Sequence, residues 1–184
     1  ITLDIELEYH NIQKEVYDYL KLFYPNMSPC IQLLGNCKLL LPIPCNHIIT
    51  SPPYASAFKP SKKISKIAEE KYHISEDEFQ VYAKTQGNVG IMNTFLYSQE
   101  MEKCYRLYYQ SILPGGTLSV VTKDIIENGK RTYLTKFIER VCTQIGFKLE
   151  AWIKTEMHGG PRQDIRRSKG LFTIDEEDTL IFRK

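Results

Sequence analysis

The segment His47–Tyr54 constrains the fold of this chain most, because an apolar run there meets two consecutive prolines. Ile48 and Ile49 are typical of the end of a buried strand, and Ser51-Pro52-Pro53-Tyr54 follows them. Neither proline has a backbone N–H and both fix φ, so the strand must end and the chain must leave it along a stiff path. The segment therefore predicts a turn at the carboxyl end of a strand, which is where open α/β sheets bind ligands.

This turn carries hydrogen-bond acceptors next to an aromatic ring. The hydroxyl of Ser51 and the carbonyl of Pro52 can both accept from an exocyclic –NH₂ group. Tyr54 can stack on a flat heterocycle, as in enzymes that flip a base out of nucleic acid and modify it. The alternative is an ordinary Pro-Pro turn that closes a strand, with Tyr54 at the surface.

The tetrapeptide with its lead-in strand resembles the catalytic motif of amino-directed DNA methyltransferases, Ser/Asp/Asn-Pro-Pro-Tyr/Phe/Trp. The Ser form is most similar to the cytosine-N4 branch, whereas the Asp form is commoner in adenine-N6 enzymes. The resemblance implies that S-adenosylmethionine is the methyl donor, that double-stranded DNA is the partner, and that the setting is restriction-modification. It also implies that a flipped base is the substrate and that four residues are catalytic: Ser51, Pro52, Pro53 and Tyr54.

A second stretch resembles the same family. Residues 30–34 are typical of a short buried strand, and Gly35-Asn36 follows it. In the family this strand commonly ends in Gly-Asp beside the adenine ring of the cofactor, and here Asn36 stands where Asp is usual. The resemblance implies cofactor contacts from Gly35, Asn36, Thr50 and Ser51. The alternative is that Gly35-Asn36 is only a turn.

Hydrophobic periodicity predicts the remaining elements. Helices are expected at 11–24, 76–85, 94–112 and 131–145, and the apolar side of the helix at 94–112 includes Phe95 and Leu96. Strands are expected at 1–10, 118–121, 147–153 and 179–182, with a helix start as the alternative within 1–10. Residues 112–118 resemble a structural Leu-x-Pro-Gly-Gly-x-Leu segment that places its strand next to the Pro-Pro strand. The last two strands look like the antiparallel hairpin that closes the methyltransferase sheet. We expect one α/β domain over 1–184 with a class I S-adenosylmethionine-dependent methyltransferase (Rossmann-like) sheet, the resemblance covering about 30–184.

Two basic segments are candidates for DNA phosphate contacts. One follows Tyr54 and the other is a glycine-rich loop between the last two strands. In either place a solvated, non-functional surface is the alternative. The candidate phosphate-binding residues are Lys59, Lys62, Lys63, Arg162, Arg166, Arg167 and Lys169.

Composition limits the partners, the cellular compartment and the kinds of site that the sequence allows. The net charge of +2 permits nucleic acid as a partner without requiring it. The five cysteines are odd in number and form no Cys-x-x-Cys pair, so we expect reduced thiols in a cytoplasmic protein and no zinc site. No stretch is long and apolar enough to predict a membrane span, and no signal peptide is recognised.

One hallmark of the family is not found in residues 1–184, namely the Phe-x-Gly-x-Gly loop that holds the methionine part of the cofactor. The resemblance therefore covers the catalytic half of the fold. The explanations are a fragment, a second chain that carries the cofactor half, or an inactive relative.

The function predicted is methylation of cytosine N4 in DNA. The alternatives are adenine N6, a nucleic-acid-binding module without chemistry, or an RNA guanine-N2 enzyme, against which Ser51 argues.

Overall fold

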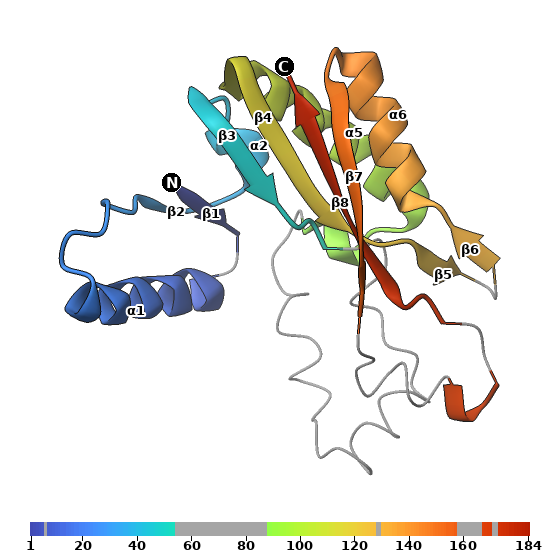
Figure 1. Cartoon of the computed structure of the whole chain (residues 1–184), viewed down its shortest axis with the longest axis horizontal. Helices are drawn as coiled ribbons and strands as arrows, with labels where there is room; N and C mark the ends of the chain where they lie inside the picture. The colour runs from blue at the N-terminus through green and yellow to red at the C-terminus, as the bar shows by residue number, and fades with distance from the viewer. Residues whose placement is uncertain (6, 54–87, 128–129, 158–166, 171–172) are drawn as a thin grey trace.

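A computed structural model describes residues 1–5, 7–53, 88–127, 130–157, 167–170 and 173–184 (Figure 1). The predicted helix at 76–85 lies outside these residues. The described elements in chain order are β1 (Thr2–Asp4), α1 (Leu7–Phe23), β2 (Gln32–Leu34), α2 (Cys37–Leu40), β3 (Cys45–Thr50), the 3₁₀ turn η2 (Val89–Ile91), α5 (Thr94–Ser111), β4 (Ile112–Thr122), β5 (Ile125–Glu127), β6 (Lys130–Thr132), α6 (Leu134–Ile145), β7 (Lys148–Glu156) and β8 (Glu176–Arg183).

The main sheet has the strand order β3-β4-β8-β7. Strand β3 runs parallel to β4, with Thr50 opposite Val120. Strand β8 is inserted antiparallel between β4 and β7, with Leu180 opposite both Val120 and Trp152. The predicted pairing of the Pro-Pro strand with the strand after Pro114-Gly115-Gly116 is confirmed, and so is the closing antiparallel hairpin.

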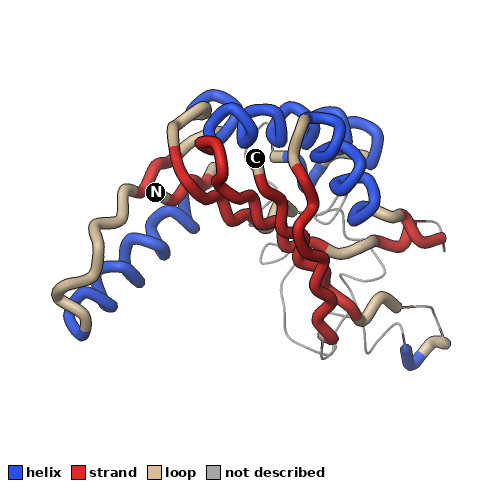
Figure 2. The backbone as a smooth tube through the Cα atoms, turned by 45° about the horizontal axis from the view of Figure 1, so that its top comes forward, coloured by secondary structure: helices blue, strands red, loops and turns tan. Residues whose placement is uncertain are grey.

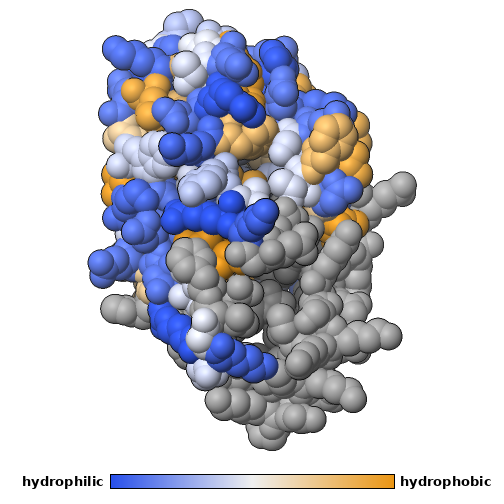
Figure 3. All heavy atoms as spheres, turned by 90° about the vertical axis from the view of Figure 1, so that its right-hand side faces the viewer, coloured by the Kyte–Doolittle hydropathy of each residue, from blue (hydrophilic) through white to orange (hydrophobic). Residues whose placement is uncertain are grey.

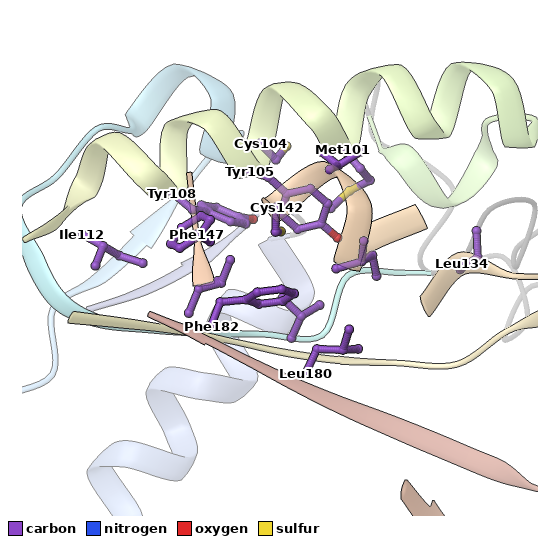
Figure 4. Packing of buried hydrophobic residues seen from close by; sticks show 14 of the residues in the cluster. Met101, Cys104, Tyr105, Tyr108, Ile112, Leu134, Cys142, Phe147, Leu180 and Phe182 are labelled. Carbon is purple, nitrogen blue, oxygen red and sulfur yellow. The ribbon is translucent and has the colours of Figure 1, made fainter. Parts of the chain in front are cut away.

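The helices α5 and α6 cover one face of this sheet (Figure 2). Alternation along β4 and β8 turns apolar side chains toward these helices, which bury them completely. The core combines Met101, Cys104, Tyr105 and Tyr108 of α5 and Ile138 and Cys142 of α6 with Leu118, Val120, Leu180 and Phe182 of the sheet (Figure 4).

The buried face of α5 differs from the predicted one. Phe95 is 70% exposed and Leu96 is also exposed, although both were expected on the apolar side of the helix. Tyr97 is buried instead, because it lies one turn before Met101 and two turns before Tyr105 on the same helix face.

The strands predicted as buried at 30–34 and 48–49 are not buried among the described residues. Ile49 is 80% exposed and Leu34 is 45% exposed. The physical reason is pairing on one side only: β3 pairs with β4, and β2 pairs with β1. An apolar pair such as Ile48-Ile49 indicates a strand but does not tell how many neighbours the strand has.

The N-terminal elements form a separate parallel pair, β1 with β2, connected by α1 (Figure 1). The predicted strand over 1–10 ends at Asp4, and the helix begins at Leu7 instead of residue 11. No residue of α1 is buried, so the apolar side chains of Ile12, Val16 and Tyr19 are exposed.

The connection from β4 to α6 contains the hairpin β5–β6, which the sequence patterns did not predict. Asp124 is buried there and accepts hydrogen bonds from the Thr135 backbone N–H (3.1 Å) and hydroxyl (2.8 Å). Its other oxygen accepts from Arg131 Nε at 2.8 Å. Asp124 therefore satisfies orphan donors at the start of α6 and fixes that helix to the end of β4.

The outer surface is uneven in polarity. Seen from the side of α6, it is largely hydrophilic, and its hydrophobic areas are small and separate (Figure 3). Exposed apolar side chains gather instead on α1, and Ile49 adds one on β3. None of the helices in the described ranges has the length and apolar character that a membrane crossing requires.

Gly116 of β4 lies close against the backbone of β3, and its substitution by alanine is our first test. An added Cβ would collide with the carbonyl oxygen of Asn46 and lie 2.7 Å from Ile112 Cγ2. We expect Gly116→Ala to lower the free energy of unfolding by about 2–3 kcal/mol in urea denaturation. Gly115→Asn is the control, because Gly115 has φ +81° and open space around it, and asparagine tolerates that conformation. An equal loss of unfolding free energy in both variants would contradict the close approach of β3 to Gly116.

Candidate active site

A cleft of about 780 Å³ separates the β1–β2 pair from the main sheet. Its walls include residues 1–5 on one side and residues 47–53 on the other. The segments that follow β1, β2 and β3 all reach it, so the cleft has the position expected of a ligand site in an open α/β sheet.

Six of the predicted site residues line this one cleft. They come from two segments that are separate in the sequence: Gly35, Asn36, Thr50, Ser51, Pro52 and Pro53. Ser51 is exposed, Pro53 is half-buried and Pro52 is buried. Tyr54, Lys59, Lys62, Lys63, Arg162 and Arg166 lie outside the described residues.

The Gly35-Asn36 turn follows β2, is hydrogen-bonded to β1 and caps α2. Gly35 N–H donates to the carbonyl oxygen of Asp4 at 2.7 Å, which holds the ends of β1 and β2 together. The Asn36 side-chain oxygen accepts from the Lys38 N–H at 3.0 Å and caps α2. Asn36 therefore has a structural role in the turn, and its amide –NH₂ is the part that a ligand can use.

Asp4 lines the same cleft and was not singled out in the sequence. Gln13 Nε2 donates to its carboxylate over 3.4 Å. An acidic residue at the carboxyl end of a short strand is the signal that could have found it, because strand carboxyl ends face the ligand in this fold class.

Tyr108 connects the Pro-Pro segment to α2. Its hydroxyl hydrogen-bonds with Thr50 at the end of β3 and with Cys37, and burial raises the pKa of Tyr108. Because Thr50 directly precedes Ser51, the hydrogen bond from this buried tyrosine to Thr50 holds the start of the turn in place.

Cys37 and Cys104 meet at the floor of the cleft, with their sulfur atoms 3.9 Å apart. The Cys104 thiol hydrogen-bonds with Cys37 and lowers the pKa of Cys37 to about 6; Tyr108 and the charge of Lys38 act in the same direction. The same interaction and burial raise the pKa of Cys104. Reduced thiols were predicted, but the pairing was not, because 67 residues separate them and no local motif joins them.

An ion-pair group fixes α2 against α5 beside these thiols. Lys38 Nζ pairs with Glu100 Oε2, and Lys103 Nζ pairs with Glu100 Oε1 at 2.6 Å. Both lysines lower the pKa of Glu100. Lys38 follows Cys37 directly, so the pair holds the start of α2 near Cys104.

Two of the predicted phosphate-contacting residues are described by the structure. Arg167 Nη2 forms an ion pair with Asp175 Oδ1 at 2.9 Å, which lowers the pKa of Asp175. Lys169 is exposed. The arginine is thus already engaged within the chain.

No protein-family model matches this chain, and the sequence of no curated protein matches it either. Among solved structures, the chain is similar to a protein from Thermus thermophilus described as a "Putative DNA Modification Methylase". The TM-score is 0.50 and the identity 20%, over 82% of this chain and 52% of that one. The same protein complexed with S-adenosyl-L-methionine gives a TM-score of 0.48 and 18% identity, over 80% and 52% of the two chains.

An S-adenosylmethionine-dependent methyltransferase from Methanosarcina mazei gives a TM-score of 0.49 at 9% identity, over 99% of this chain and 80% of that one. The chain spans about half the length of the Thermus structures. At these identities the likeness concerns the fold alone, and it confirms the predicted class I methyltransferase fold.

The lowered pKa of Cys37 predicts unusual thiol reactivity. We expect its alkylation by iodoacetamide, followed by peptide mass spectrometry, to accelerate as pH rises through about 6, because the thiolate is the reactive form. Cys104→Ala removes the main hydrogen bond to the thiolate and should shift this midpoint upward. A wild-type midpoint near the ordinary value of 9.0 would contradict the interaction.

Proposed function

We propose that this chain is the catalytic half of a DNA methyltransferase that transfers a methyl group from S-adenosylmethionine to an exocyclic amino nitrogen, cytosine N4 in particular. The observation that carries the proposal is the shared cleft. The Ser51-Pro52-Pro53 turn at the end of β3 lines the same hollow as Gly35-Asn36, so a substrate site and a cofactor site are adjacent. The class I methyltransferase fold supports this use of the cleft.

The residues of the cleft suit an adenosyl group. Its volume of about 780 Å³ is that of small-molecule sites, which are mostly apolar with a few polar groups. Leu41, Ile48 and Val89 provide apolar surface. The Asp4 carboxylate can accept from ribose hydroxyls, and the Asn36 amide can donate to a ring nitrogen. S-adenosylmethionine bound here supplies an electrophilic methyl group.

The Pro-Pro turn has the acceptors that amine methylation needs. An aromatic amine is a poor nucleophile, because its lone pair is delocalised into the ring. Hydrogen bonds from the –NH₂ group to Ser51 Oγ and the Pro52 carbonyl favour a pyramidal nitrogen and aim its lone pair at the methyl carbon. Rate enhancement then comes from positioning and preorganised dipoles, and no covalent enzyme intermediate is required.

The transfer balances without a further co-reactant. The nitrogen lone pair forms the new N–C bond as the C–S bond breaks, and the sulfur leaves with that electron pair as a neutral thioether. The methylated nitrogen releases one proton. Ser51 is exposed, so solvent next to its hydroxyl can take this proton away.

We place the glycine-rich cofactor loop on a second chain or on a segment outside residues 1–184. One observation supports this part of the proposal: the chain spans about half of the Thermus structure.

Substitution of Ser51 and Tyr54 tests the chemistry. With radiolabelled S-adenosylmethionine and mixed-sequence double-stranded DNA, we expect the wild-type chain to transfer label to the DNA. In Ser51→Ala, which lacks one acceptor, the rate of transfer should fall by about 100-fold or more. Tyr54→Ala should lose roughly 1–3 kcal/mol of base stacking, and Tyr54→Phe should keep it. Thr143→Ala, an exposed position on α6, is the control and should leave the rate unchanged.

The outcomes separate the alternatives. Digestion of the labelled DNA to nucleosides distinguishes cytosine N4 from adenine N6. Label that appears only after a second chain from the same cells is added would place the cofactor loop on that chain. No label under either condition, with DNA binding intact, would contradict the proposal and leave the nucleic-acid-binding module.

The Arg167–Asp175 pair yields a separate test of DNA contact. Asp175→Asn removes the carboxylate that pairs with this guanidinium, so we expect tighter binding to mixed-sequence DNA and a salt dependence steeper by about one phosphate contact. Glu156→Gln is the matched control, since it removes one exposed negative charge for which the structure gives no arginine pair. The same change in both variants would mean that net charge alone acts and that Arg167 does not contact phosphate.

A further inference from the structure

The side chains of Cys37 and Cys104 are in direct contact. Cys37 is the first residue of α2 and Cys104 lies within α5, and their sulfur atoms are 3.9 Å apart (Figure 4 shows Cys104). Both residues line the candidate cofactor cleft. The methyl transfer described above uses neither sulfur, so the pair has no role in that reaction.

The two sulfurs can reach bonding distance through a small movement. A disulfide requires about 2.0 Å between the sulfurs, so the gap must close by roughly 2 Å. Cys104 is in the packed core on an 18-residue helix, whereas α2 has only four residues, none of them buried. The movement therefore falls on α2 and on the Gly35-Asn36 turn before it.

The surroundings give the two thiols different roles. Three side chains act on Cys37: Cys104 and Tyr108 on α5, and the Lys38 ammonium on its own helix. Glu100 on α5 pairs with Lys38 and acts on Cys104. Cys104, Tyr108 and Lys38 together lower the pKa of Cys37, whereas the interaction with Cys37 and burial raise the pKa of Cys104, so Cys37 is the more acidic thiol of the two. This is the arrangement of an attacking thiolate beside a resolving thiol.

The other cysteines lack such a partner in the described part of the chain. Burial raises the pKa of Cys142 to about 12 and also raises that of Cys45, so both are poorly reactive. Cys30 is half-buried and is not among the residues of the cleft. Oxidation should therefore select Cys37.

We propose that Cys37 and Cys104 are a peroxide-sensitive thiol pair whose disulfide ties the Gly35-Asn36 turn to α5 and weakens S-adenosylmethionine binding in the cleft. The crosslink draws Cys37 away from the Tyr108 hydroxyl, which also bonds Thr50, and shifts the turn that carries Asn36. The disulfide itself is independent of the proposed function, whereas the effect on cofactor binding rests on it.

The chemistry is a two-electron oxidation with hydrogen peroxide as oxidant. The Cys37 thiolate forms an S–O bond as the O–O bond breaks, and hydroxide leaves and becomes water. The Cys104 sulfur then attacks the Cys37 sulfur, so the S–S bond forms as the S–O bond breaks. The second hydroxide leaves with the Cys104 proton as water, and a thiol reductant reverses the process.

The first experiment treats the full chain with hydrogen peroxide near pH 7 and maps its peptides without reduction. We expect a Cys37–Cys104 link, a loss of about 2 Da in the intact mass, and full recovery with dithiothreitol. Cys37→Ser and Cys104→Ser should abolish the link, while Cys30→Ser and Cys142→Ser should retain it. The rate should fall as pH drops below about 6. Sulfinic acid on Cys37 in the wild type, or links to other cysteines, would overturn the pair.

The second experiment measures S-adenosylmethionine binding to the reduced and oxidised chain by calorimetry. We expect oxidation to raise Kd by about tenfold, which corresponds to 1.4 kcal/mol, and Cys104→Ser to be insensitive to peroxide. Equal affinities of the two forms would overturn the cofactor effect while the disulfide stands. Binding to neither form would instead count against the proposed cofactor site.

Discussion

Strand β4 is paired along both edges, and most of the described structure depends on it. On one edge it positions β3 and so the Pro-Pro turn; on the other it positions β8 and through it β7. One of its faces is buried under α5 and α6, where Leu118 and Val120 have no exposed surface. The close approach at Gly116 is what allows the backbone of β3 to lie against it. The Pro-Pro turn thus follows a strand that is paired directly with this well-packed strand, which suits a function that depends on fixed acceptors.

Periodicity predicted the elements that contribute most to the core. The helices α5 and α6 and the strands β7 and β8 were expected within a few residues of where they lie, because their apolar residues repeat at 3.6 or 2 over long stretches. Strand β4 was expected at 118–121 but already begins at Ile112. The hairpin β5–β6 and the helix α2 were missed, since elements of three or four residues carry no periodic signal. The burial of β2 and β3 was predicted wrongly, because the number of neighbours of a strand is a tertiary property that Ile48-Ile49 cannot encode.

The candidate site, too, was predicted from the sequence only in part. Gly35-Asn36 and Ser51-Pro52-Pro53 each end a strand, so local sequence was enough to expect them at one edge of a sheet, and both line one cleft. The Thr50–Tyr108–Cys37–Cys104 chain of contacts was beyond sequence reasoning, because its members come from three elements that only the packing of α5 on the sheet brings together. These contacts couple the floor of the cleft to both of its motifs, so a change at one thiol reaches the cofactor and substrate sides together.

Among the described residues, β3 has a strand partner on one edge, and its other edge has a consequence for how the chain behaves in concentrated solution. Residues 45–50 contain no Lys, Arg, Asp or Glu, and Ile49 is exposed, so this edge lacks the charges that usually discourage strands of neighbouring molecules from pairing. After Ser51 come Pro52 and Pro53, and neither can donate to a ladder. The prolines thus limit the length of any intermolecular ladder on this edge and act as gatekeepers against fibre growth, in addition to shaping the turn.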